Sequence, residues 1–92
     1  MEASFDRFFK EVEDRLYSVY RFAKVEKTNY DASLDTLYIK CRFYLYGEEK
    51  AVKYVTHGFM IRDLGCSAMV EDAVKVICNY INGELMKGRR KK

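Results

Sequence analysis

The sequence has no tryptophan, no proline, one histidine and only three cysteines in 92 residues. Because proline is absent, every backbone N–H can take part in a helix or a sheet. A single histidine without any paired Cys/His spacing offers no ligand set for zinc. The motifs of P-loops, dinucleotide-binding turns and serine hydrolases are missing as well. We therefore expect no metal, no cofactor and no enzymatic activity.

The three cysteines, Cys41, Cys66 and Cys78, are odd in number and widely spaced. This usage is typical of reduced, buried thiols in an intracellular protein. The first six residues carry acids where a signal peptide needs bases, and no apolar run approaches the roughly 18 residues of a membrane span. We expect a soluble protein of the cytoplasm.

Cys41 and His57 are the best remaining pair for catalysis, because an imidazole beside a thiol can generate a nucleophilic thiolate. They would be neighbours if paired positions of two adjacent strands had residue numbers that sum to 98. Cys41 belongs to an apolar row, however, and no third residue is evident to orient His57. Ordinary packing of a small thiol is the favoured interpretation.

The chain is 49% hydrophobic and 34% charged, which indicates one folded domain with a single core. It has 17 basic and 14 acidic residues, but five of the bases lie in residues 87–92. Residues 1–86 therefore hold 12 bases against 14 acids, a net charge of −2. We predict one domain over residues 1–86, followed by a basic tail over residues 87–92, and the domain itself is not basic.

Residues 37–46 alternate strictly between apolar and polar side chains, which predicts a half-buried β-strand. The apolar positions are Leu37, Ile39, Cys41, Phe43 and Leu45, and the polar positions are Tyr38, Lys40, Arg42, Tyr44 and Tyr46. The apolar face must be covered by the rest of the chain, and the polar face is left to solvent or to a partner.

Helical spacing of apolar residues predicts a first helix over residues 4–23 and a second one that ends at Asn82-Gly83. The first has its apolar residues at Phe5, Phe8, Phe9, Val12, Leu16, Val19, Tyr20 and Ala23, and the second at Val70, Ala73, Val74, Ile77, Cys78 and Ile81. Tyr17 falls outside the first apolar stripe. Met69, Val76 and Tyr80 make the second stripe wider than one sheet requires, which favours a homodimer.

The strands beside the central one are less distinct. Residues 23–30 suit a first edge strand, with a simple loop as the alternative. A turn over residues 47–50 leads to a strand over residues 51–61, with a bulge near His57-Gly58. We therefore predict an α+β two-layer sandwich of order α-β-β-β-α, in which an antiparallel sheet of two to three strands has both helices on one face.

The polar face of the central strand is the main candidate site. Tyr38, Lys40, Arg42, Tyr44 and Tyr46 place aromatic rings between cations, with Lys53 or Tyr54 as further members and Tyr17 as a separate anchor. Tyr and Arg are concentrated at protein interfaces, and bases also stack on Tyr while Lys and Arg contact phosphates. The same residues also occupy half-exposed strand positions without any binding role.

Our leading hypothesis is a small binding protein that docks onto or occludes a protein or nucleoprotein partner, as an inhibitor or adaptor. The alternative is direct binding of RNA or single-stranded DNA. The residues predicted for this alternative are Arg42, Lys53, Lys87, Arg89, Arg90, Lys91 and Lys92. An import or docking signal is a further interpretation of the tail, and solubility alone is the default interpretation.

The order helix, three strands, helix resembles that of the double-stranded-RNA-binding domain and of the Alu-binding subunits of the signal recognition particle. In the former, the second helix opens with a lysine-rich phosphate clamp. The matching residues 67–72 read Ser-Ala-Met-Val-Glu-Asp, with two acids and no lysine. The resemblance is one of element order, so we assign the chain to no family and carry no residue roles over.

Overall fold

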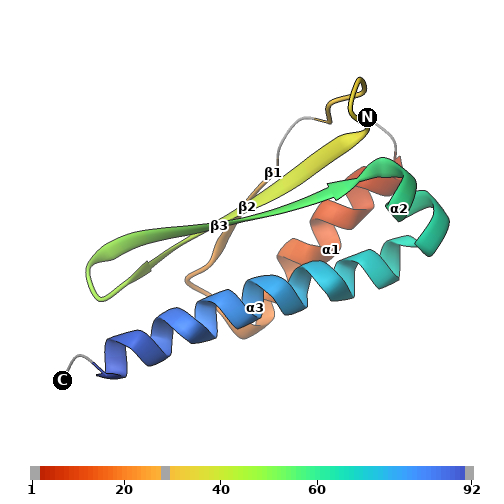
Figure 1. Ribbon diagram of the computed structural model, residues 1–92. Coiled ribbons are helices and arrows are strands. Elements are labelled where there is room, and N and C mark those ends of the chain that lie inside the picture. The colour runs from red at the N-terminus through yellow and green to blue at the C-terminus, as the bar shows by residue number, and fades with distance from the viewer. Residues whose placement is uncertain (1–2, 28–29, 91–92) are drawn as a thin grey trace.

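The computed structural model describes residues 3–27 and 30–90 and has the predicted α+β architecture (Figure 1). Its elements are α1 (Ala3–Val19), β1 (Lys24–Lys27), β2 (Thr36–Leu45), β3 (Glu48–His57), α2 (Gly58–Leu64) and α3 (Cys66–Arg90). The strands form an antiparallel sheet in the order β1-β2-β3, and the helices lie on one face of it (Figure 1). The order α-β-β-β-α is confirmed, with the short helix α2 inserted before α3.

Strand β2 is central and has the predicted period of two. Leu37, Ile39 and Cys41 are fully buried, whereas Tyr44 is 66% exposed. The predicted first edge strand is also present as β1, which pairs with β2 over four residues. Positions 28 and 29 of that prediction lie outside the described residues. The sheet thus has a closed face, against the helices, and an open face.

The hairpin between β2 and β3 is tighter than expected. Its turn consists of Tyr46 and Gly47, with φ angles of 54° and 80°, as in a type I′ turn. The prediction of a turn over residues 47–50 is therefore wrong, since Glu48 already pairs with Leu45. A turn with two positive φ angles matches the twist of the strands, and this is what sets the register.

The predicted strand over residues 51–61 is wrong beyond His57, where α2 begins. The backbone N–H of Phe59 donates to Asp35 Oδ2 at 2.8 Å, and that of Gly58 donates to the Asp35 carbonyl at 2.9 Å. These bonds satisfy N–H groups that a helix start leaves open. A Cβ at position 58 would lie 2.3 Å from Asp35 Oδ1, so only glycine fits there without a shift. The expected bulge is absent because the chain turns into a helix instead.

The core lies between the closed face of the sheet, α1 and α3. Most predicted core residues are buried in it, including Phe5, Phe8, Phe9, Val12, Leu16, Val70, Ala73, Ile77 and Ile81. Val19 is an exception at 61% exposed, because α1 ends there instead of at residue 23. Met69 is 3% exposed and belongs to the core, so it does not contribute to a surplus apolar surface.

Helix α3 does not stop at Asn82-Gly83 as predicted but continues to Arg90. Glycine inside a helix costs only about 1 kcal/mol relative to alanine. Glu84 supports the extra turns, because its carboxylate lies 3.2 Å from Lys87 Nζ and 3.5 Å from Lys50 Nζ of β3. In the described part of the chain, no helix is long and apolar enough to cross a membrane.

Candidate functional site

The open face of the sheet gathers side chains from all three strands. Residues that pair across an antiparallel ladder point to the same face, so the register fixes its membership. The open face comprises Lys24 and Glu26 of β1, Thr36, Tyr38, Lys40, Arg42 and Tyr44 of β2, and Glu49, Ala51, Lys53, Val55 and His57 of β3. Four predicted site residues of β2, together with Lys53, are thus brought together.

Arg42 lies at the centre of the open face and is held on two sides. Its Nη1 lies 2.7 Å from Glu26 Oε1 and its Nε lies 3.1 Å from Glu49 Oε1. The hydrogen bond to Glu26, followed by the charges of Glu26 and Glu49, raises the pKa of Arg42. The guanidinium therefore links all three strands, and much of its charge is already compensated by acids.

Lys53 and Tyr38 form a second contact on the open face. The Lys53 ammonium lies 4.4 Å from the centroid of the Tyr38 ring, a cation–π distance. This places a cation over one side of an aromatic ring that a base would otherwise use for stacking. Lys40 pairs directly with Lys53 across the ladder, so two positive charges lie side by side. With four bases and two acids, the open face has an excess of positive charge.

Two other residues that were predicted for the open face lie elsewhere in the structure. Tyr46 lies in the hairpin turn, and its hydroxyl donates to the Leu85 carbonyl of α3 at 3.2 Å. Tyr54 lies on the closed face at 7% exposed, where its hydroxyl donates to Asp72 Oδ2 at 2.5 Å. Burial, and next the bond to Asp72, raises the pKa of Tyr54. The prediction failed for Tyr46 because alternation ends where the turn begins.

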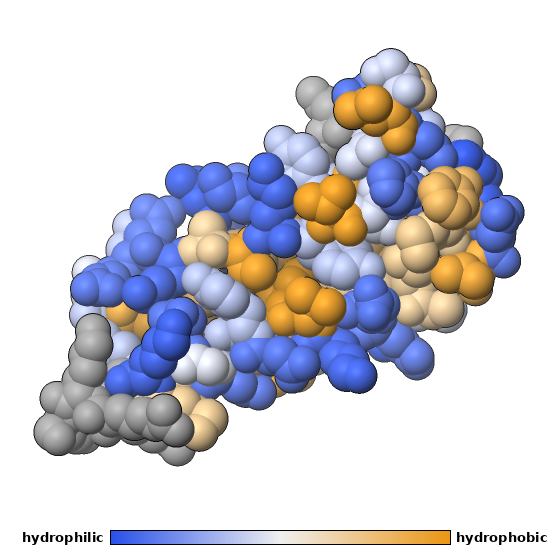
Figure 2. All heavy atoms as spheres, viewed as in Figure 1, coloured by the Kyte–Doolittle hydropathy of each residue, from blue (hydrophilic) through white to orange (hydrophobic). Residues whose placement is uncertain are grey.

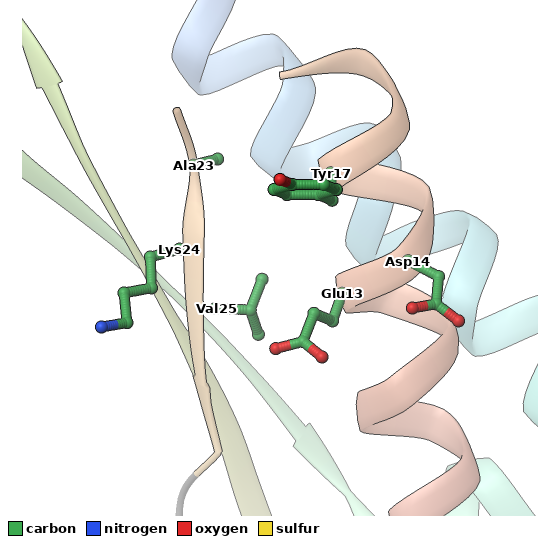
Figure 3. A pocket seen from close by; sticks show the side chains of 6 residues that line it. All are labelled: Glu13, Asp14, Tyr17, Ala23, Lys24 and Val25. Carbon is green, nitrogen blue, oxygen red and sulfur yellow. The ribbon is translucent and has the colours of Figure 1, made fainter. Parts of the chain in front are cut away.

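Tyr17 is exposed as predicted but lies apart from the open face. It lines a pocket of about 320 Å³ between α1 and β1. Figure 3 shows the Tyr17 ring and the Glu13 carboxylate directed from α1 toward Val25, while Lys24 points to the other side of β1. The Arg21 guanidinium lies 5.7 Å from the centroid of the Tyr17 ring. Tyr17 and the open face are therefore two separate surfaces.

Asp35 organises a polar cluster that the sequence did not predict. Tyr30 donates its hydroxyl to the Asp35 carboxylate, and Arg62 Nη2 lies 3.3 Å from Asp35 Oδ2. Hydrogen bonds from Tyr30 and then from the Phe59 backbone lower the pKa of Asp35. Asp35 has a φ angle of 49°, a conformation that aspartate tolerates better than most residues. The sequence signal for this cluster was an aspartate just before a strand. The role of Asp35 is to start α2.

Cys41 and His57 do not form the pair considered for catalysis. Cys41 is opposite Val52, whereas His57 is opposite Thr36 at the far end of the ladder. Burial, with a smaller effect of Cys78, raises the pKa of Cys41 to about 11, so its thiol stays protonated near neutral pH. His57 Nδ1 instead lies 3.3 Å from both Thr36 Oγ1 and the Asp35 carbonyl. Among the described residues, no three His, Cys, Asp or Glu side chains are grouped as a metal site requires.

The basic tail is in part an extension of α3, which includes residues up to Arg90. Lys87 donates to Glu84 Oε1 at 3.2 Å. The predicted contacts of Lys91 and Lys92, and of the Arg89 and Arg90 side chains, lie outside the described part of the structure.

Comparisons of the chain with protein-family models, with curated proteins and with solved structures found no match.

Proposed function

We propose that this protein is a non-enzymatic binding protein that docks onto a protein or nucleoprotein partner through the open face of its sheet. The observation that carries the proposal is the exposure of Tyr44 and Val55, at 66% and 53%, on a sheet face that none of the helices among the described residues covers. Tyr and Arg, the residues at the centre of this face, are enriched at protein interfaces, where aromatic side chains serve as anchors.

The charges of the open face favour a protein partner over nucleic acid. Arg42 is compensated by Glu26 and Glu49, so a phosphate would have to displace two carboxylates. Lys53 occupies one side of the Tyr38 ring, which makes that ring less available to a base. A mixed-charge surface with pre-ordered ion pairs gives specificity toward a protein surface of complementary charge.

The proposal is tested by comparing anchors on two surfaces. Wild-type protein, the variant Tyr44→Ala and the control Tyr17→Ala are immobilised, and partners are captured from nuclease-treated extract and then purified for affinity measurement. Loss of an interface anchor should weaken binding by at least about tenfold for Tyr44→Ala. The control should bind within about twofold of wild type. Equal affinity of Tyr44→Ala and wild type for the purified partner would overturn the proposal.

Direct binding of RNA or single-stranded DNA is the second candidate, supported by the adjacent Lys40 and Lys53 next to the exposed Tyr44. Phosphate contacts release counterions, so the affinity for a labelled single strand should fall linearly with salt on a log-log plot. Lys40→Gln should reduce the slope by about one unit under this candidate. Under the leading proposal, the purified protein binds such a strand weakly and without difference between Lys40→Gln and wild type.

A further inference from the structure

Strand β3 is a long edge strand. It spans ten residues and pairs with β2 on one side, while the opposite edge strand, β1, spans only four. An edge strand presents unpaired N–H and C=O groups that can accept another strand, and proteins usually keep such edges short or cover them. In the described residues, no strand pairs with the outer edge of β3.

The hairpin turn identifies the groups on that outer edge. In a turn of this type, the carbonyl of Leu45 accepts a hydrogen bond from the N–H of Glu48, so these two residues form a hydrogen-bonded pair. Such pairs alternate along an antiparallel ladder. The outward N–H and C=O groups of β3 therefore belong to the alternate residues Glu49, Ala51, Lys53 and Val55. All four side chains are exposed and lie on the open face.

If β3 pairs with β3 of a second copy of the protein, the charges along the edge favour one register. If two β3 strands pair antiparallel about a two-fold axis at Ala51, Glu49 lies opposite Lys53 of the partner subunit, and this pair occurs twice. An axis at Lys53 would place the two Lys53 side chains opposite each other, which is destabilising. An axis at Val52 would pair Glu49 with Val55 and form no ion pair. Only the axis at Ala51 allows both the backbone hydrogen bonds between the two edges and the ion pairs between Glu49 and Lys53. It also places a small residue at the two-fold axis.

The helix layer supports the same axis. Helix α3 runs antiparallel beneath β3 and is tied to it by Tyr54 with Asp72, at 2.5 Å, and by Lys50 with Glu84, at 3.5 Å. Between these tie points lie Val76 and Tyr80, one and two helical turns after Asp72 and hence on the same side of α3.

Val76 and Tyr80 are 42% and 36% exposed. Figure 2 shows apolar side chains at the surface in the middle of the view, in the region between β3 and α3 of Figure 1. An axis at Ala51 would bring this apolar strip against the same strip of a second copy.

We propose that the protein forms a homodimer in which two β3 strands pair antiparallel about Ala51, so that the two sheets join into one of six strands. The Val76 and Tyr80 side chains of both copies meet below this junction. The open face stays exposed and is doubled in area, so the dimer does not depend on the proposed function.

A charge-reversal pair of variants tests the proposal. By light scattering at micromolar concentration, the wild type should have about twice the 10.9 kDa monomer mass. Glu49→Lys alone places two lysines opposite each other in the dimer, and Lys53→Glu alone places two glutamates there. Each single variant should be monomeric, and an equimolar mixture should recover the dimer, since opposite charges then face each other at both positions. A monomeric wild type, or variants that stay dimeric on their own, would overturn the proposal.

Two substitutions of Ala51 test the register itself. Ala51→Pro removes an outward N–H and leaves the bonds between β2 and β3 in place, so it should give a folded monomer by circular dichroism and light scattering. Ala51→Cys should form a disulfide-linked dimer on mild oxidation, because residues paired at the axis have Cα atoms about 5.5 Å apart. The control Lys53→Cys places the two thiols about 13 Å apart along the strands and should not cross-link. Efficient cross-linking of Lys53→Cys, but not of Ala51→Cys, would overturn this register.

Discussion

The two faces of β2 are built from neighbouring residues and are held by different forces. On the closed face, Leu37, Ile39 and Cys41 are fully removed from water, and their contribution is burial and close packing. On the open face, Arg42 and Lys53 make cross-strand contacts at half-exposed positions, which contribute little to stability. The closed face therefore determines that the chain folds, and the open face can be selected for binding.

The two faces also differ in the surroundings of their polar groups. On the closed face, the Tyr54 side chain is 7% exposed, and its hydroxyl donates to one partner, Asp72 of α3. On the open face, Arg42 has two carboxylate partners and remains accessible to solvent. A partner that docks on the open face exchanges some of these contacts for others, whereas any change on the closed face disturbs the core.

Phe43→Ala should have the largest effect on stability. Phe43 is 1% exposed, and its ring lies between those of Phe22 and Tyr80, at centroid distances of 6.2 and 6.0 Å. Truncation of a buried aromatic side chain lowers the free energy of unfolding by about 3 to 5 kcal/mol. Urea unfolding followed by circular dichroism measures this loss. A loss below about 1 kcal/mol would mean that the closed face is not the core.

The same closed face was the part most accessible to prediction. Strict alternation over residues 37–45 leaves one way to bury a strand, and a one-residue slip would expose every apolar side chain. The stripes of α1 and α3 were equally clear, because Val12, Leu16, Ile77 and Ile81 recur at helical spacing and all are fully buried.

The failed predictions depend on contacts between residues distant in sequence. Helix α2 starts because Asp35, some 24 positions earlier, accepts the N–H of Phe59. The predicted end of α3 at Gly83 is wrong, because Glu84 just after it pairs with Lys50 of β3. Alternation along β2 predicted which of its residues lie on the open face. For β3, the strand register was needed to show that Lys53 lies on the open face and Tyr54 does not.

Cys41 should make the closed face sensitive to alkaline pH. Its pKa is raised from 9.0 to about 11, so the folded protein retains the thiol proton over a pH range in which the unfolded chain releases it. This contribution is complete below pH 9 and is lost as pH rises toward 11, by about 2 to 3 kcal/mol in total. Urea unfolding at several pH values measures the decline. In Cys41→Ala, the decline between pH 9 and 11 should be smaller, and an unchanged slope would contradict this role.

Tyr54→Phe should have an intermediate effect, because it removes one hydroxyl without leaving a large cavity. The lost bond to the Asp72 carboxylate should lower the free energy of unfolding by about 1 to 2 kcal/mol. The matched control is Tyr46→Phe, whose hydroxyl bonds to the Leu85 carbonyl at an exposed position. The control should change stability by less than about 0.5 kcal/mol. Equal losses in both variants would show that burial does not distinguish the two hydroxyls.

Tyr44→Ala should have the smallest effect on stability, although it is adjacent to Phe43 in sequence and also removes an aromatic ring. Tyr44 is 66% exposed on the open face, so the unfolded and folded chains leave its ring in similar contact with water. The free energy of unfolding should change by no more than about 0.5 kcal/mol. Urea unfolding of Tyr44→Ala beside Phe43→Ala gives the comparison directly. A loss of several kcal/mol would mean that the open face is covered within the protein's own assembly. Tyr44 would then belong to a contact between subunits instead of a surface that binds another partner.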